Sequence, residues 1–222
     1  MRLLAPIALI AFGMPVHAQD AEALAEKMLT ALGGRAAWAA TTNTVNDSQQ
    51  NWDGDPSVLR AVITMDFERP RFRIESRGEG LHVIRVIDGD KSWRMTRDGK
   101  ISAVPPELFA DELKWYRGHV YRTLHRIAKR DPVIKLAVGK EGRLEVFEGE
   151  TRIAWYLLDR ANQPYRYGAN EDDAGSLFGP WDAEKSGIRH PVYVTRTDGK
   201  WRAMLKRLEV NVSLDEALFA RP

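Results

Sequence analysis

The chain has 222 residues, of which 44% are hydrophobic and 29% are charged, and its formal net charge at pH 7 is +2. A chain of this size and composition can bury one sizeable core, so we expect a single globular domain. The balanced charge predicts neither a nucleic-acid partner nor a strongly charged substrate. Cysteine is absent, which excludes disulfides, thiol catalysis and lipid attachment through an N-terminal cysteine.

Residues 1–18 have the pattern of a cleavable signal peptide. Arg2 supplies a positive charge, an apolar run extends from Leu3 to Met14, and small residues precede Gln19. We therefore expect cleavage after Ala18 and a mature periplasmic chain of residues 19–222. No later segment approaches the roughly 20 apolar residues of a membrane-spanning helix, so we expect at most peripheral contact with a membrane.

A helical arm follows the signal peptide. Asp20 is a good N-cap, and the apolar residues of the arm share one face at helical spacing up to Leu32. Gly33 is placed to end this helix in a left-handed conformation, and Gly34 frees residues 35–40 to form a second, redirected turn of helix. We expect Trp38 to be buried there, close to the first strand.

From Thr41 the apolar pattern changes from helical to alternating. Segments such as VLRAVITMDFE, residues 58–68, have one apolar and one polar face, as a strand with one wet face requires. Turn signals recur between these segments, and the pattern predicts roughly ten antiparallel strands. The turn signals are Asp53-Gly54, Asp88-Gly89, Asp98-Gly99, Glu141-Gly142 and Asp198-Gly199.

Two features of the second half shape the expected fold. Residues 107–130 carry apolar side chains at steps of three and four between flanking prolines, which predicts one long amphipathic helix from Glu107 to Arg130. In the last strand the apolar parity changes around Lys206 and Arg207, which indicates a β-bulge, although burial on both faces would also explain it.

Together these elements predict an α+β fold. A single antiparallel sheet of this size tends to curl and must bury its apolar face, so we expect a strongly curved sheet in the form of a half-open β-barrel. Both helical segments, residues 20–40 and 107–130, are expected to cover its concave face. Gly33 and Gly34 would let the first segment follow the curve.

The whole mature chain resembles the superfamily of LolA-like periplasmic proteins, which includes the lipoprotein carrier LolA, its receptor LolB and the lipid-binding LppX. The resemblance is carried by the arm AEALAEKMLTALGGRAAWAA, two strand meanders around a mid-chain helix, and the terminal NVSLDEALFARP. It implies an apolar half-barrel, covered by helical lids, and this half-barrel would bind acyl chains. It also implies an arginine that controls the lid, for which Arg60, Arg69, Arg71 and Arg73 are candidates.

We therefore expect a non-enzymatic carrier whose partner is a lipid or an acylated lipoprotein, with an envelope protein as a further partner and no cofactor. Aromatic and apolar side chains on the inner face would line the acyl site. The expected lining residues are Ile63, Met65, Phe67, Phe72, Ile74, Trp93, Trp115, Tyr116, Trp155 and Trp201.

Two other functions stay open at this point. The concavity could be filled completely, which would leave a structural or interaction module of the envelope. A hydrolase with carboxylates from distant strands is the second alternative, because such pairs need not be close in the sequence. No nucleophile motif and no ligand-spaced metal cluster is present in the sequence, so no catalytic residue and no metal ligand is predicted.

Basic residues flank the apolar stripe of the mid-chain helix, at Lys114, Arg117, Arg122, Arg126, Lys129 and Arg130. A helix that touches anionic headgroups would have this pattern. A solvated helix face whose last turn suits the helix dipole has it too, and is favoured.

Overall fold

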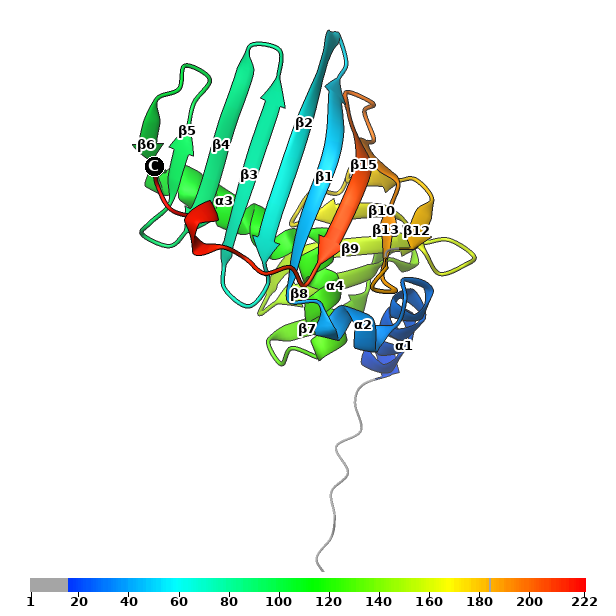
Figure 1. The fold of residues 1–222 in the computed structure, drawn as a ribbon. Helices are drawn as coiled ribbons and strands as arrows, with labels where there is room; N and C mark the ends of the chain where they lie inside the picture. Colours follow the sequence, from blue (N-terminus) through cyan, green and yellow to red (C-terminus); the bar gives the residue numbers. More distant parts are fainter. Residues whose placement is uncertain (1–15, 184) are drawn as a thin grey trace, which may run out of the picture.

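The computed structural model describes residues 16–183 and 185–222, so most of the predicted signal peptide lies outside the described residues (Figure 1). Among the described residues, thirteen strands form one antiparallel sheet in the order β6-β5-β4-β3-β2-β1-β15-β14-β11-β10-β9-β8-β7. Strands β12 (Trp181–Ala183) and β13 (Arg189–Pro191) form a separate ribbon. The predicted α+β class with one antiparallel sheet is confirmed.

The strands of the first half are β1 (Asn43–Trp52), β2 (Asp55–Asp66), β3 (Arg71–Gly78), β4 (Leu81–Asp88), β5 (Trp93–Met95) and β6 (Ile101–Ala103). Those of the second half are β7 (Ile134–Val138), β8 (Leu144–Glu148), β9 (Thr151–Leu158), β10 (Pro164–Ala169), β11 (Ser176–Phe178), β14 (Tyr193–Arg196) and β15 (Trp201–Val210). The five predicted turns all connect neighbouring strands of the sheet.

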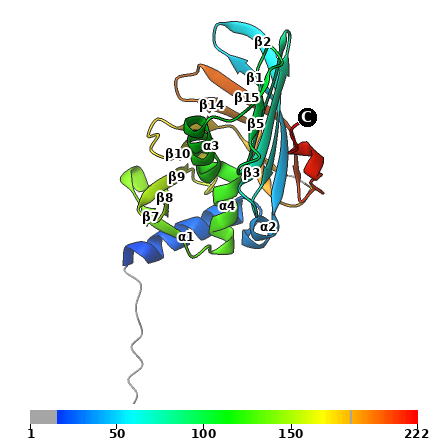
Figure 2. The same cartoon turned by 90° about the vertical axis from the view of Figure 1, so that its left-hand side faces the viewer.

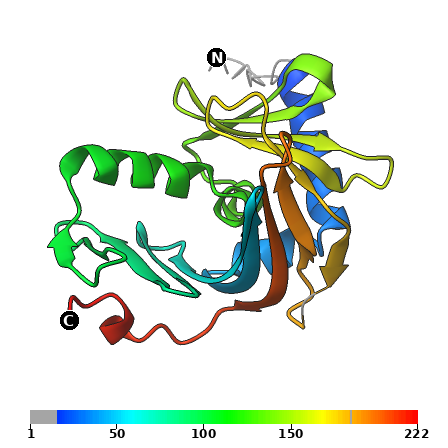
Figure 3. The same ribbon diagram turned by 90° about the horizontal axis from the view of Figure 1, so that it is seen from above.

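The sheet is curved and open. Figure 3 shows that its two halves face each other across α3 (Pro106–Gly118) and α4 (Val120–Lys129), while the edge strands β6 and β7 are not paired with each other. The expected bulge in β15 is present: Asp47 of β1 is paired with Arg207 and Ser48 with Leu205, so Lys206 is the extra residue. Such bulges bend a strand and increase its twist, which favours the curvature.

The sequence predicted one continuous mid-chain helix, which is wrong: the helix breaks at His119. The backbone of His119 is extended, with φ −62° and ψ 134°, and its Nδ1 accepts a hydrogen bond from the backbone N–H of Tyr121. His119 is therefore the N-cap of α4. The end of α3 comes close to the sheet at Gly118, where an added Cβ would lie 2.5 Å from the carbonyl oxygen of Ile153 in β9.

The N-terminal arm forms α1 (Val16–Ala31) and α2 (Arg35–Ala40). Asp20 lies inside α1 and is not its N-cap, which corrects the sequence prediction. Helix α1 packs on β7 and β8 at one end of the sheet, whereas α3 and α4 lie between its halves (Figure 2). The arm therefore closes one end of the fold and does not run along the concave face.

Gly33 has the positive φ that the sequence predicted, +107°, and a second reason to be glycine. A Cβ at this position would lie 2.1 Å from the carbonyl oxygen of Gly187, in the loop between β12 and β13. The backbones stay close because the N–H of Arg189 donates to the carbonyl oxygen of Leu32 at 2.9 Å. The break between α1 and α2 is thus where the β12–β13 ribbon docks.

Gly33→Ala is expected to lower the free energy of unfolding by about 2 kcal/mol, because the alanine is strained at this φ and its Cβ displaces the ribbon. Gly34→Ala is the matched control, since φ is also positive there and nothing lies within 4 Å of the added Cβ. Urea unfolding of both variants would separate the two effects. Equal losses would show that backbone strain alone matters and that the close approach does not.

The main core lies between the inner face of the sheet and the helices. Trp38 is fully buried there, its indole N–H donates to the carbonyl oxygen of Leu32, and its ring stacks on Tyr121 of α4 at 6.0 Å between centroids. The predicted burial of Trp38 is confirmed. The aromatic ring on which it stacks belongs to α4, whereas the sequence analysis placed Trp38 close to the first strand. A smaller apolar cluster contains Ile84, Val86, Trp93 and Phe219, the last from the C-terminal segment.

Candidate functional site

A cavity of about 600 Å³ lies between the inner face of the sheet and the junction of α3 and α4. Strands from both halves border it: β1 to β4 and β15 on one side, and β10, β11 and β14 on the other. The helices contribute Trp115, His119, Val120 and Tyr121. The unclosed sheet and the break at His119 therefore leave a space that the side chains do not fill.

Most of the cavity lining is apolar. Its apolar and aromatic side chains include Ile63, Ile74, Tyr167, Phe178 and Val194. Trp52 and Trp201 lie side by side at the β1–β2 turn end, with ring centroids 6.3 Å apart, and 47% of the Trp52 surface is exposed. We take this aromatic pair as the mouth of the cavity.

The inner face of β1 is polar, although its neighbours in the sheet are apolar. Asn46, Ser48 and Gln50 alternate along the strand and all border the cavity. The Ser48 hydroxyl donates to the Ala61 carbonyl oxygen at 3.4 Å, and the Gln50 amide donates to the Ser48 oxygen at 3.5 Å. These distances exceed the usual ~2.9 Å, so the polar groups of β1 are weakly bonded within the protein.

The helix junction adds uncharged polar groups to the cavity. Burial lowers the pKa of His119 to about 3, so the ring is neutral at pH 7. Because Nδ1 accepts a hydrogen bond from the backbone N–H of Tyr121, the ring proton is on Nε2. Burial also raises the pKa of the Tyr121 and Tyr167 hydroxyls. At neutral pH these three side chains carry no charge.

The charged side chains that border the cavity all have hydrogen-bond or ion-pair partners within the protein. Arg85 Nη1 donates to Glu112 Oε1 of α3 at 2.6 Å, which ties the helix to β4. Arg196 is 3.6 Å from the carboxylate of Asp198. The carboxylate of Asp172 accepts from the backbone N–H groups of residues 174 and 175. Among the described residues that border the cavity, both arginines are therefore paired with carboxylates, and the Asp172 carboxylate is held by backbone donors.

Four of the ten predicted lining residues border this cavity: Ile63, Ile74, Trp115 and Trp201. Four others are packed in the main core: Met65, Phe67, Phe72 and Tyr116. The indole N–H groups of the last two, Trp93 and Trp155, donate to the backbone oxygens of Phe219 and Asp172, and neither ring borders the cavity. The sequence could show which strands were amphipathic, but not which tryptophan faced inward.

Several lining residues were missed by the sequence analysis, notably Tyr121, Tyr167, Phe178 and the polar residues of β1. The segment NTVNDSQQNW has no apolar alternation, so its inward face gave no signal. Tyr121 was hidden because the continuous helical pattern gave no indication of a break at His119. A break in the helix changes which residues face the sheet.

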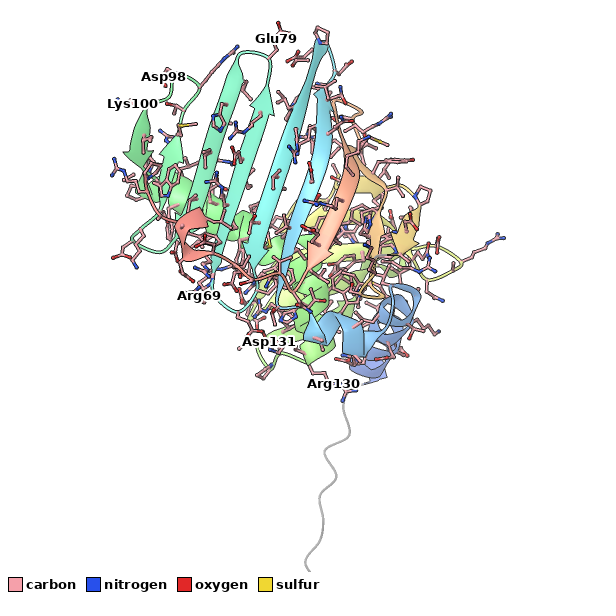
Figure 4. The ribbon with its side chains drawn as sticks, in the orientation of Figure 1. Arg69, Glu79, Asp98, Lys100, Arg130 and Asp131 are labelled. Atoms are coloured by element: carbon pink, nitrogen blue, oxygen red, sulfur yellow. The ribbon has the colours of Figure 1, made fainter. Side chains whose placement is uncertain are left out.

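The four candidate lid arginines have acidic partners outside the cavity. Arg60 pairs with Asp47, Arg73 with Glu75, and Arg69 and Arg71 both with Asp66 and Glu216. Figure 4 shows Arg69 at the β2–β3 turn, at the end of the sheet opposite Glu79. The arginine that joins the sheet to α3 is Arg85, which was not among the candidates.

Some basic residues of the predicted mid-chain helix, now divided between α3 and α4, also have acidic partners. Arg126 pairs with Asp131 and Glu148, and Lys129 pairs with Glu68. Arg122 packs its guanidinium over the ring of Tyr116 at 4.4 Å. Arg126 is buried and Arg122 is half-buried, whereas Lys129 and Arg130 are exposed, so the solvated face that the sequence favoured is present only in part.

Within residues 16–183 and 185–222, no group of three or more His, Asp or Glu side chains is arranged to hold a metal ion. None of the helices described in the structure has the length and apolar character needed to cross a membrane.

No family model and no curated protein matches this chain. Similar solved structures include a DUF1329 family protein from Desulfovibrio piger, with 9% identity, TM-score 0.42, and coverage of 91% of this chain and 97% of that one. An uncharacterized conserved protein from Thermus thermophilus has 13% identity, TM-score 0.40, and coverage of 85% and 90%. The Pseudomonas aeruginosa MucA/MucB complex has 12% identity, TM-score 0.39, and coverage of 91% and 61%. Each of these TM-scores is below 0.5.

Proposed function

We propose that this protein is a periplasmic, non-enzymatic binding protein that shields an acyl chain of a lipid or acylated protein in its cavity. The observation that carries the proposal is the space of about 600 Å³ between the sheet and the helix junction. Binding sites for small molecules have volumes of about 300–1,000 Å³ and mostly apolar linings with a few polar groups. The predicted signal peptide and the single domain of residues 19–222 belong to the same proposal.

In this proposal the curved sheet acts as a half-open barrel and α3 and α4 act as its cover. The Arg85–Glu112 pair would hold α3 against β4, and the aromatic pair Trp52 and Trp201 would border the entry. A chain of about ten methylenes gains roughly 8 kcal/mol on burial, a value comparable to the cost of its lost freedom. Affinity is therefore expected to rise with chain length.

A charge placed inside the cavity tests this proposal. Ile63→Lys is expected to weaken binding of a fluorescent fatty acid at least tenfold, because the lysine occupies the cavity and leaves it with an uncompensated charge. Val62→Lys is the matched control: it lies on the same strand, half-buried like Ile63, but does not border the cavity. Fluorescence titration of the delipidated proteins, with circular dichroism to check folding, gives the comparison.

Equal binding by the wild type and both folded lysine variants would show that the probe binds elsewhere. No uptake of any acyl probe by the wild type would remove the carrier function and leave the structural or interaction module as the remaining interpretation.

A further inference from the structure

Asn46 is the least satisfied polar group of the cavity wall. Its side-chain oxygen Oδ1 is buried and has no hydrogen-bond partner among the residues that the structure describes. Its cross-strand neighbours on the two sides are Ile63 of β2 and Leu208 of β15, whose side chains cannot hydrogen-bond. The nearest polar positions on the same face of the strand are Thr44 and Ser48, at the usual spacing of two residues.

An unpaired buried acceptor lowers the stability of the folded protein unless another molecule supplies a hydrogen-bond donor. Asn46 borders the cavity, and a half-turn of its amide about the Cβ–Cγ bond presents Oδ1 to a bound ligand. The weak bonds of Ser48 and Gln50 leave the rest of the polar stripe on β1 accessible to the same ligand. A purely alkyl ligand would leave Asn46 Oδ1 unpaired.

The charge balance of the cavity restricts the polar group of the ligand. Arg85, Arg196 and Asp172 are each engaged by protein partners, and His119 is neutral. An anionic headgroup would find no unpaired cation and would lose its water on entering. An uncharged hydroxyl or amide meets no such penalty and can donate to Asn46.

From these observations we propose that the cavity selects long-chain ligands with an uncharged hydroxyl or amide group that donates to Asn46 Oδ1. This inference deepens the proposed function and depends on it. Asn46 thereby determines specificity, and the apolar wall supplies most of the affinity.

Two matched pairs of neutral probes test the proposal: myristyl alcohol with its methyl ether, and myristamide with its dimethyl amide. Each pair differs in its donor hydrogens and in the methyl groups that replace them. The wild type is expected to bind the donor-bearing member roughly tenfold more tightly in calorimetric titration, which corresponds to one hydrogen bond. It is also expected to bind myristyl alcohol more tightly than ionised myristic acid.

The variant Asn46→Leu should bind both members of each pair equally. Because the substitution removes an unpaired acceptor from between two apolar neighbours, the ligand-free variant should melt at the same or a higher temperature than the wild type. Asn51→Leu is the matched control, on the same strand but outside the cavity lining, and should keep the wild-type preference.

The outcomes separate this inference from the function on which it rests. If no probe binds, charged or neutral, the proposed function itself fails. If the probes bind without a preference for the donor, or if Asn46→Leu keeps the preference, the carrier function stands and the role of Asn46 is wrong. Tighter binding of myristic acid than of the alcohol would contradict the selection for an uncharged group.

Discussion

Trp38→Ala is expected to lower the free energy of unfolding by about 3–5 kcal/mol, as for other fully buried aromatic residues. Trp38 has no exposed surface, stacks on Tyr121 and donates its indole N–H to the Leu32 carbonyl oxygen. The substitution leaves a void between α2 and α4, and the Leu32 carbonyl oxygen keeps only the hydrogen bond from the N–H of Arg189. Urea unfolding followed by far-ultraviolet circular dichroism measures the loss.

Trp52→Ala is the control for this prediction, because Trp52 lies at the mouth of the cavity with 47% of its surface exposed. We expect a loss below about 1 kcal/mol for this variant. A similarly small loss for Trp38→Ala would show that the helical arm does not depend on α4 for its position.

Arg71→Leu is expected to cost about 3 kcal/mol, because it breaks a buried ion pair from one side. Only 2% of the Arg71 side chain is exposed, and its guanidinium bonds Asp66 at 2.9 Å and Glu216 at 2.8 Å. The same group packs over the ring of Phe219 at 4.2 Å. Without it, the C-terminal segment loses a buried attachment to the sheet and should become sensitive to protease.

Arg69→Leu is the matched control, since Arg69 pairs with the same two carboxylates but is 54% exposed. Solvent screens an exposed pair, so we expect a loss below about 1 kcal/mol and an intact C-terminal segment. Urea unfolding and limited proteolysis of both variants test the difference. If the two variants lose the same stability, burial of Arg71 does not set the strength of this attachment.

The sequence predicted those parts of the fold whose signals are local. Alternation in residues 58–68 predicted β2, the Asp-Gly pairs predicted turns, and the parity change near Lys206 predicted the bulge that the pairing of β1 and β15 confirms. Each of these signals arises from a few neighbouring residues and is independent of the rest of the chain.

Features that depend on tertiary packing were predicted less well. The periodicity of residues 107–130 continued through His119, whereas the break coincides with the close approach of Gly118 to β9. Asp20 had the chemistry of an N-cap, but α1 extends past it. Tryptophan content predicted an aromatic lining, yet the rings of Trp93 and Trp155 pack elsewhere, because residue type does not specify which face of the sheet a side chain occupies.

The candidate site illustrates the same limit. Ile63 and Ile74 were predicted to line it, because apolar residues on amphipathic strands face inward. The polar inner face of β1 was missed, because Asn46, Ser48 and Gln50 resemble surface residues in the sequence. Their inward position follows from the pairing of β1 with β2 and β15, which joins the two ends of the chain.

Native mass spectrometry of the protein purified from envelope extract without detergent tests the carrier function most directly. The account predicts a species heavier than the polypeptide by the mass of one acyl-containing molecule, which organic extraction removes and added lipid restores. Detection of the bare polypeptide alone, together with failure of the extracted protein to take up any long-chain compound, would contradict it.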